Sequence, residues 1–318
     1  MNKRVLGRTA IEVSEISFGG VEIGIPYGIG VESQADMLDQ AEAIKLLRAA
    51  VDGGINFFDT ARFYGQSEDI MGKAFNDIRD KVVICTKCKY LKGDNNLRPA
   101  NKSLRKVIDN SLKESLLALQ ADYIDVYMIH NATLEILDNQ EIAEIFLGYK
   151  SKGVARAIGV STYAVEETRK AIKCGTWDVI QLPFNLMDQR QGELFSSASQ
   201  RGVGVVVRSV LLKGVLTDKG RNLHPALYAV QQHRQLYNEL LSEDVPRLSD
   251  LATKFVLSHN EVSSVLVGID RMKYLQDALA VANGRYLNKK TLTRAREFSY
   301  PEPAFLDLRR WDKMGWLR

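Results

Sequence analysis

The sequence lacks the features that mark several large classes of protein. No stretch approaches the roughly 18 consecutive apolar residues of a membrane-spanning helix, and the basic start MNKRVLGRTA is not followed by the apolar run of a secretory signal. The 43 basic residues nearly balance the 39 acidic ones, for a net charge of +4 without a basic stripe for nucleic acid. The three cysteines are an odd, sparse set that fits a reducing compartment. We therefore expect a cytoplasmic protein that binds neither nucleic acid nor membranes.

Two of the cysteines, Cys85 and Cys88, have the spacing of a redox C-x-x-C motif. They fall in or beside the segment VVICTK (82–87), whose β-branched residues indicate a strand. Residues three apart on a strand point to opposite faces, and redox pairs favour a helix N-terminus. We therefore interpret both cysteines as small buried hydrophobic residues.

Apolar, β-branched runs recur along the chain and alternate with segments of helical periodicity. One helical segment, QAEAIKLLRAAVD (40–52), is followed by Gly53 and Gly54, a typical helix end. Continuous apolar strands that alternate with helices imply a parallel sheet buried on both faces. Eight such units predict an α/β fold, a single-domain (β/α)8 or TIM barrel over residues 1–318. The expected strands are 15–20, 55–60, 82–87, 123–130, 155–161, 178–184, 204–209 and 263–269.

The alternative fold is an open doubly wound sheet, which usually carries G-x-G-x-x-G after its first strand, whereas this chain has FGGVEIG. Three segments exceed the simple repeat: a glycine-rich loop at 21–40, an insertion at 210–260 with two expected helices (224–241 and 246–260), and a tail at 284–318. Long segments after barrel strands tend to be functional. Their aromatic residues are candidates for a substrate pocket, although we expect most of them to be packing residues: Tyr27, Tyr90, Tyr163, Trp311 and Trp316.

Polar residues stand where several expected strands end, and a (β/α)8 barrel has its active site at the carboxyl ends of its strands. Asp59, Lys87 and His130 end three successive strands, and Tyr64 follows Asp59 by five residues. Each has an ordinary explanation alone: Asp59 as a turn cap, Lys87 as a solvated residue, His130 as a core histidine. Because three adjacent strand ends carry them, we expect the four side chains to converge on one pocket.

The four residue types suit proton transfer to a carbonyl oxygen. A free tyrosine has a pKa of about 10, and we expect a nearby Lys87 ammonium, paired with Asp59, to lower the pKa of Tyr64. His130 would donate a hydrogen bond that positions the substrate oxygen. No side chain supplies a hydride, whereas a nicotinamide cofactor does.

The sequence resembles the aldo-keto reductases along nearly its whole length, through GINFFDTARFYGQSE, VVICTK and DYIDVYMIH. The resemblance implies a barrel preceded by a β-hairpin at 1–16, with NAD(P)H extended across the carboxyl face. It implies an NAD(P)(H)-dependent oxidoreductase that interconverts an aldehyde, ketone or sugar with an alcohol. Tyr64 would be general acid and base, and Lys87 and Asp59 would adjust its pKa. His130 would orient the carbonyl. The segment RSVL after the seventh strand resembles a bacterial subgroup presumed to act on sugars.

The resemblance also implies the residues that contact the cofactor. Ser161, Thr162 and Gln181 would hold the carboxamide, with Thr162 in place of an asparagine. Arg208 stands where many members stack an aromatic ring on the nicotinamide, and a planar guanidinium also stacks. The remaining candidates are Gly20, Asp59, Ser209, Leu211, Lys213, Gly214, Gly268, Asp270, Arg271, Tyr274 and Asp277.

The choice between the two nicotinamide cofactors depends on LVGIDRMKYLQDAL, which resembles the adenosine-end motif. Arg271 or Lys273 would meet a 2′-phosphate, while Asp270 would repel one and hydrogen-bond a free ribose. Ala278 replaces an asparagine that often contacts adenine. The family favours NADP(H), and NAD(H) stays open.

Two other functions remain open. Lys87 at a strand end also suits a Schiff-base lyase, although pairing with Asp59 would keep it protonated. The same fold serves as a regulatory channel subunit that retains the cofactor, and the four polar residues do not exclude that role. Arg62, Phe63 and Gln66 receive no role from the sequence.

Overall fold

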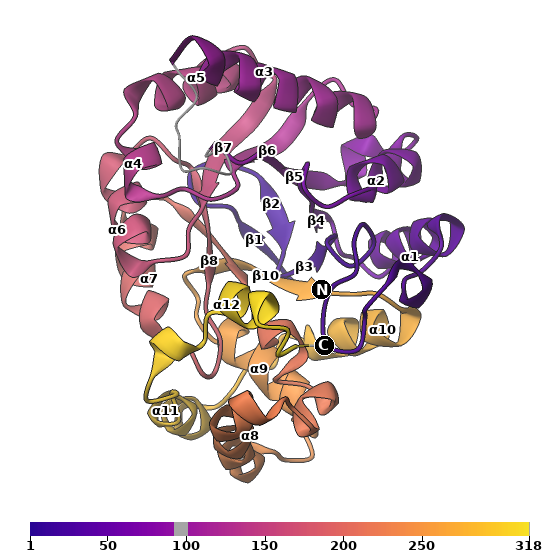
Figure 1. Ribbon diagram of the computed structural model, residues 1–318, viewed down its shortest axis with the longest axis vertical. Coiled ribbons are helices and arrows are strands. Elements are labelled where there is room, and N and C mark those ends of the chain that lie inside the picture. The colour runs from indigo at the N-terminus through magenta and orange to yellow at the C-terminus, as the bar shows by residue number, and fades with distance from the viewer. Residues whose placement is uncertain (92–100, 318) are drawn as a thin grey trace.

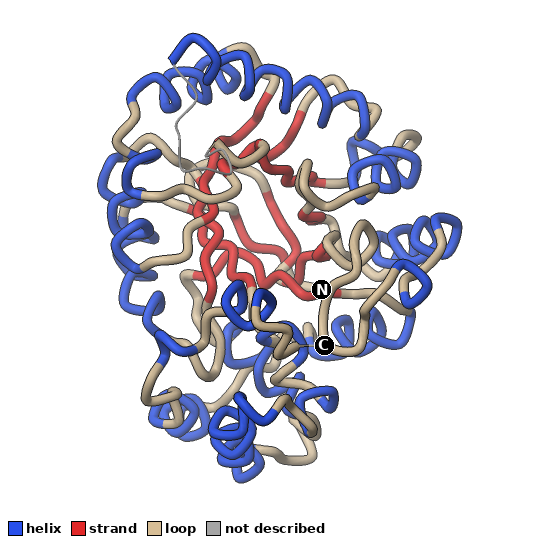
Figure 2. Tube along the Cα trace, viewed as in Figure 1, coloured by secondary structure: helices blue, strands red, loops and turns tan. Residues whose placement is uncertain are grey.

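The computed structural model describes residues 1–91 and 101–317. Eight parallel strands close into a barrel, because the first barrel strand pairs both with the second and with the last. Figure 2 shows these strands at the centre of the molecule with helices around them. The predicted (β/α)8 fold is thus confirmed. The barrel strands are β3 (Ile16–Gly19), β4 (Phe57–Asp59), β5 (Val83–Cys88), β6 (Ile124–Ile129), β7 (Ala155–Ser161), β8 (Val179–Pro183), β9 (Gly204–Arg208) and β10 (Val262–Gly268).

Helices form the outer layer (Figure 1). The first begins after Asp39, whose side chain accepts a hydrogen bond from the Glu42 amide at 2.8 Å, and ends before Gly53 as the sequence predicts. The helices are α1 (Gln40–Asp52), α2 (Ser67–Phe75), α3 (Asn101–Ala118), α4 (Leu134–Leu137), α5 (Gln140–Ser151), α6 (Val165–Cys174), α7 (Phe195–Gln200), α8 (Tyr228–Arg234), α9 (Leu248–Leu257), α10 (Met272–Val281), α11 (Lys289–Glu297) and α12 (Leu308–Lys313). Within the described ranges, none is both long and apolar enough to cross a membrane.

The strands separate two hydrophobic clusters, one inside the barrel and one between the barrel and its helices. On β4, Phe57 belongs to the inner cluster and Phe58 to the outer one. Cys85 likewise lies in the inner cluster and Cys88 in the outer cluster, and both are free thiols. The two-residue alternation of a strand therefore separates these cysteines, as predicted.

A hairpin closes the amino end of the barrel. Its strands β1 (Lys3–Val5) and β2 (Glu12–Ser14) pair antiparallel. Leu6, Ile11 and Val13 are buried within the inner cluster, so they fill the bottom of the barrel with apolar side chains. This plug leaves the carboxyl ends of the strands as the end where polar groups collect.

Residues 224–241 do not form the single helix that the sequence predicts. The helix α8 covers only part of the segment, with a 3-10 turn on each side. The Arg234 guanidinium donates to two carbonyl oxygens of the 215–217 segment at 2.9 and 2.7 Å. The buried Tyr237 hydroxyl lies 2.6 and 2.9 Å from two other backbone carbonyl oxygens. These tertiary contacts override the local helical periodicity.

The tail folds back over the barrel and contains α11 and α12. In Figure 1, α12 lies in front of the barrel strands. Trp311 on this helix is fully buried, and Asp312 forms an ion pair with Lys213 of the loop after β9. The tail is therefore fixed against the mouth of the barrel.

Candidate active site

The interior face of the strands changes from apolar to polar towards the mouth. Asp59, Lys87 and His130 each lie two residues beyond an inner-cluster residue, at or just past the ends of β4, β5 and β6. A period of two keeps them on the inner face. The same alternation that buries the plug therefore delivers these three groups to one place.

The Lys87 ammonium and the Asp59 carboxylate form a buried ion pair. The Lys87 Nζ lies 2.6 Å from Asp59 Oδ2 and donates a second bond to the Thr60 carbonyl at 2.9 Å. The other oxygen of Asp59 accepts from the Gln181 amide at 2.7 Å. The side chains of Asp59 and Lys87 are 1% and 0% exposed, and the hydrogen bonds on both sides offset the cost of burying the two charges.

The turn after β4 brings Tyr64 over this pair. Its backbone amide donates to the Ala61 carbonyl at 2.9 Å, and Gly65 follows with a φ of +50°. The Lys87 ammonium lies 5.1 Å from the centre of the Tyr64 ring. The centre of the His130 ring lies 5.5 Å from the centre of the same Tyr64 ring. The four predicted side chains thus surround one point at the mouth.

The pKa of Tyr64 shifts opposite to our expectation. Burial raises it well above its usual value, and the neighbouring Asp59 and Tyr163 raise it further, while Arg208 opposes them. The lowering that we expected from Lys87 is outweighed by burial and by the negative charge of Asp59, which lies 2.6 Å from the Lys87 ammonium. Tyr64 therefore holds its proton at neutral pH, which suits a proton donor.

The imidazole of His130 is neutral at the same point. Burial lowers its pKa well below the usual value, and the positive charges of Lys87 and Arg208 lower it further. Its Nδ1 is buried and has no hydrogen-bond partner within residues 1–91 and 101–317. A neutral imidazole carries one N–H group, which can donate a hydrogen bond to a ligand oxygen.

Two aromatic rings form a wall beside His130. Phe63 and Tyr90 stack with their centres 4.3 Å apart, and Tyr90 lies 4.8 Å from the His130 ring. Both are 45% exposed. We could assign no role to Phe63 from the sequence, because a single aromatic residue in a loop does not reveal which ring it stacks against. Arg62 beside it forms an ion pair with the buried Glu68 and anchors the turn.

The proposed carboxamide-binding residues lie on the neighbouring strands. Ser161 is 2% exposed, and the Thr162 hydroxyl is engaged with Thr168 at 2.6 Å. The Arg208 guanidinium donates to the Thr162 carbonyl at 2.9 Å and lies 4.1 Å from the centre of the Tyr163 ring. Gln181, as described above, is bonded to Asp59. The structure therefore groups these residues next to the four polar groups.

The loop after β9 has an unusual backbone. Ser209, Leu212, Lys213 and Gly214 all have positive φ, between 46° and 105°. Such conformations are costly for non-glycine residues and are found at functional sites. The Lys213 ammonium lies 4.4 Å from the Tyr27 ring, and the Lys213 carbonyl accepts from the Ile29 amide at 3.4 Å. The 21–40 loop and the β9 loop therefore meet across the mouth, where partly buried Leu211 also lies.

The proposed adenosine-end residues do not all lie together. Asp270 and Arg271 contact each other at 3.4 Å, and the guanidinium lies 5.5 Å from the Tyr274 ring. Asp277 instead forms an ion pair with Arg247 at the start of α9, so its carboxylate is already engaged. Lys273 is exposed, Ala278 is buried, and Gly20 donates its amide to the Asp59 carbonyl at 2.8 Å.

A carboxyl group that the sequence did not single out lies between these regions. Glu22 follows β3, and its Oε2 is buried without a hydrogen-bond partner among the described residues. Its Oε1 lies against Gly268, where a Cβ would overlap it. Burial raises the Glu22 pKa to about 8, and Asp270 and Asp59 add to the rise while Lys219 opposes it. No pattern in the sequence indicates that the carboxyl oxygen of a loop glutamate is buried.

This shift predicts how stability depends on pH. The folded protein holds the Glu22 proton up to about pH 8, and the ordinary pKa is 4.5, so stability falls as pH rises between these values. Glu22→Gln removes this loss. The full shift corresponds to about 5 kcal/mol, so we expect a melting temperature about 8 °C above wild type at pH 9 and a nearly equal one at pH 4. Glu32→Gln, on the exposed part of the same loop, should show no such pH-dependent difference.

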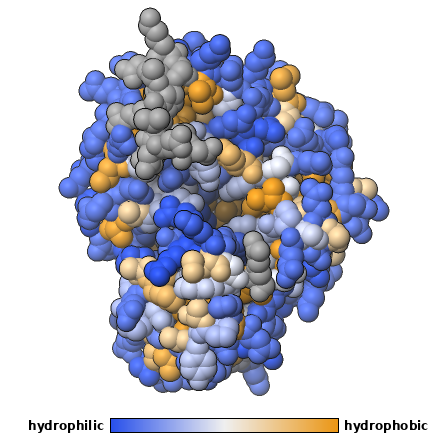
Figure 3. All heavy atoms as spheres, in the orientation of Figure 1, coloured by the Kyte–Doolittle hydropathy of each residue, from blue (hydrophilic) through white to orange (hydrophobic). Residues whose placement is uncertain are grey.

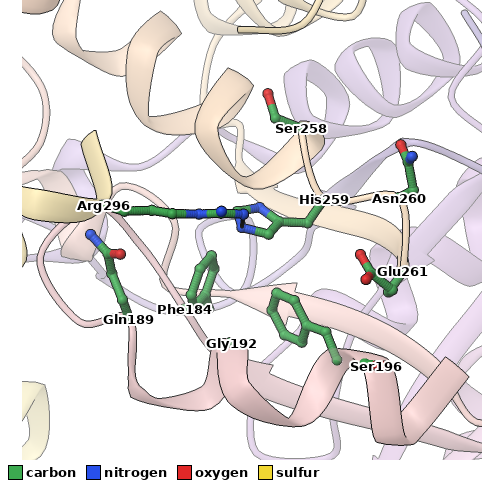
Figure 4. Close-up of a pocket in the computed structure, with 10 residues that line it drawn as sticks. Phe184, Gln189, Gly192, Ser196, Ser258, His259, Asn260, Glu261 and Arg296 are labelled. Atoms are coloured by element: carbon green, nitrogen blue, oxygen red, sulfur yellow. Dashed lines mark hydrogen bonds between the residues drawn. The ribbon is translucent and has the colours of Figure 1, made fainter. Parts of the chain in front are cut away.

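A separate crevice of about 420 Å³ lies outside the barrel (Figure 4). Its lining includes Phe184, Phe195, His259 and Arg296, and the Arg296 guanidinium lies 3.3 Å from His259 Nε2. His259 precedes β10 and so belongs to the amino-end side of the barrel. None of the proposed catalytic or cofactor residues lines this crevice. Among the described residues, no cluster of three or more His, Cys, Asp or Glu is arranged to hold a metal.

A sequence profile described as the aldo/keto reductase family matches residues 15–299. Among solved structures, the holo form of the aldo-keto reductase AKR11C1 from Bacillus halodurans superposes with a TM-score of 0.79. It is 26% identical and covers 94% of this chain and 96% of that one. The chain is therefore similar to this protein in sequence and fold over nearly its full length.

Curated relatives have both enzymatic and non-enzymatic names. The uncharacterized oxidoreductase YqkF of Bacillus subtilis is 28% identical, with 92% of this chain and 94% of that protein covered. The NADH-specific methylglyoxal reductase of Escherichia coli is 32% identical (89% and 94% covered). A probable voltage-gated potassium channel subunit beta of Arabidopsis thaliana is 28% identical (87% and 90% covered).

Proposed function

Because this chain belongs to the aldo/keto reductase family, an oxidoreductase family whose members interconvert carbonyls and alcohols, we propose that Tyr64 is its general acid and base. In this proposal a nicotinamide cofactor supplies or accepts the hydride when bound. Tyr64 gives its proton to the carbonyl oxygen during reduction and takes it back during oxidation. The observation that carries the proposal is the convergence of Tyr64, Lys87 and His130 on one point of the mouth.

Each neighbour of Tyr64 has a defined part. His130, as a neutral imidazole, donates its N–H to the carbonyl oxygen and holds it beside the Tyr64 hydroxyl. The Lys87 ammonium, oriented by Asp59, offsets the negative charge that forms on Tyr64 when it has given up its proton. Phe63 and Tyr90 keep water from one side of the bound carbonyl.

The groups around the mouth fit a nicotinamide dinucleotide. Arg208 and Ser161 would hold the nicotinamide end, and the β9 loop with Ser209, Leu211 and Gly214 would follow the diphosphate. The Oε2 of Glu22, buried and without a hydrogen-bond partner among the described residues, is a polar group between the two ends. The engagement of Asp277 with Arg247 argues that Asp277 is not among the contacts.

Cofactor addition followed by a carbonyl assay tests the proposal. A cofactor present at 100 times its Kd stabilises the native state by about 2.7 kcal/mol, which corresponds to a rise in Tm of about 5 °C or more. We expect this rise with NADP(H) or NAD(H), together with oxidation of the reduced form by aldehydes, ketones or sugars. Asp270→Asn should favour NADP(H) relative to wild type, because it removes a charge that repels a 2′-phosphate. No stabilisation by either cofactor would contradict the proposal.

Two other functions predict different results. The likeness to a probable potassium channel subunit favours a cofactor-binding regulatory protein, and stabilisation without turnover on any carbonyl would support it. A Schiff-base lyase requires a deprotonated Lys87. Borohydride trapping of substrate carbon on Lys87 would support that mechanism, but the buried ion pair with Asp59 argues against it.

A further inference from the structure

The rim of the mouth carries an unusual arrangement of cations around one tyrosine. The guanidinium of Arg208 lies 4.1 Å from the centre of the Tyr163 ring, and the guanidinium of Arg309 lies at the same distance. The two arginines come from β9 and α12, whereas Tyr163 follows β7. Segments far apart in the sequence thus bring two positive charges to one ring.

These cations face the proposed carbonyl site. Positive charge from Lys87, Arg208 and Arg309 acts on the Tyr90 hydroxyl and opposes the rise in its pKa that burial and Tyr163 cause. The Tyr90 ring lies 4.8 Å from His130. The field of the two arginines therefore reaches the space beside the histidine that would hold the substrate oxygen.

The positive charge at this rim is only partly neutralised. Arg208 donates to the Thr162 carbonyl and the Ser209 hydroxyl, and it forms no ion pair with any described carboxylate. Arg309 contacts Asp307 through one nitrogen at 3.4 Å, and 58% of its side chain remains exposed. Arg309 therefore keeps guanidinium N–H groups that face solvent and are available to a ligand.

The backbone that carries Arg309 is fixed. The Asp307 side chain caps the helix through the amides of Arg309 and Arg310, and Trp311 is fully buried beneath it. The neighbouring Asp312 is ion-paired to Lys213. Figure 3 shows strongly hydrophilic residues gathered over α12, beside a hollow near the middle of this face. A guanidinium on a fixed helix next to a hollow is oriented before a ligand arrives.

We propose that the substrate is a short carbonyl compound that carries a carboxylate or a phosphate, and that Arg309, held on the Tyr163 ring, binds this anion. The proposal rests on the carbonyl–alcohol interconversion proposed above. A planar guanidinium binds either anion through two parallel hydrogen bonds, so the two chemistries share one site. Arg309 is a specificity residue here, because it touches the substrate away from the reacting atoms.

Matched substrates and variants test the anion site. The substrates are succinic semialdehyde against butanal, and glyceraldehyde 3-phosphate against glyceraldehyde. We expect wild type to prefer the charged member of at least one pair by about tenfold or more in kcat/KM, and which pair responds identifies the anion. Arg309→Leu should remove this preference mainly through KM, leaving the uncharged aldehyde within about twofold. Arg309→Lys should restore part of it.

Arg310→Leu is the matched control, because Arg310 is the adjacent exposed arginine and lies 6.0 Å from the Trp316 ring instead of at Tyr163. It changes the net charge equally and should leave the preference intact. Equal use of charged and uncharged aldehydes by wild type would overturn the proposal, as would equal effects of the two substitutions.

If none of the four aldehydes is reduced, the proposed oxidoreduction of these substrates fails, and the anion site is judged by binding alone. Calorimetric titration of the cofactor-saturated protein with succinate and with glycerol 3-phosphate does not need turnover. Binding that Arg309→Leu weakens by about tenfold and Arg310→Leu does not would support the anion site independently. Absence of binding by both anions would overturn it.

Discussion

Replacing Tyr64 by Phe should lower kcat for carbonyl reduction by about 10²- to 10⁴-fold, the usual contribution of a positioned proton donor. The substitution removes only the hydroxyl, and the ring contacts with Lys87 and His130 at 5.1 and 5.5 Å can persist. Cofactor binding should change little. The measurement is steady-state reduction of a good aldehyde, with cofactor affinity determined separately by thermal shift.

Tyr90→Phe is the control for this experiment. Tyr90 carries the other phenol next to His130, with ring centres 4.8 Å apart, and it is 45% exposed. We expect its loss to change kcat by no more than a few-fold. If Tyr64→Phe retained full activity, or if Tyr90→Phe were the inactive variant, the assignment of the proton donor would be wrong.

Replacing Lys87 by Met should impair both stability and catalysis. The substitution leaves the Asp59 carboxylate buried without its cation, and breaking a buried pair in this way costs about 3–5 kcal/mol of the free energy of unfolding. The remaining partner of Asp59, the Gln181 amide at 2.7 Å, is uncharged. Activity should fall by at least about 100-fold, because no charge then offsets the developing phenolate. Urea denaturation and the aldehyde assay measure the two effects.

The double variant Asp59→Asn with Lys87→Met separates these two roles. Removing both charges should recover most of the lost stability, since no unpaired charge remains buried. Activity should stay low, because the ammonium beside Tyr64 is still absent. A double variant as unstable as Lys87→Met alone would indicate that packing, and not charge, holds this part of the barrel together.

The barrel was predictable because its signals are periodic. Each buried strand is a short apolar run, and each expected range overlaps an observed strand closely, for example 155–161 and β7. Asp59, Lys87 and His130 were identifiable because a strand end and a parallel sheet fix where their side chains go. The predicted helix at 224–241 was wrong in its extent, because the contacts of Arg234 and Tyr237 with distant backbone outweigh local propensity.

The remainder of the site depends on contacts between segments that no spacing relates. Arg309 meets Tyr163 only because the tail crosses the mouth, and the carboxyl group of Glu22 lies against Gly268 of a distant strand. The pKa of Tyr64 was predicted in the wrong direction, since residue types alone do not reveal that burial outweighs a lysine already paired with aspartate. Trp311, considered for the pocket, is fully buried and is a packing residue, as expected for most of these aromatics.

The pairing of β3 with β10 has a consequence for how the chain matures during synthesis. Ile16 leaves the ribosome long before Val265, its partner in the sheet. Closure of the barrel must therefore wait until β10 has emerged, and pairing between such distant strands forms slowly. During that interval the edge of β3 is unpaired and exposed to other chains. Arg309 follows every barrel strand in the chain, so the proposed substrate selectivity would be acquired after the barrel itself.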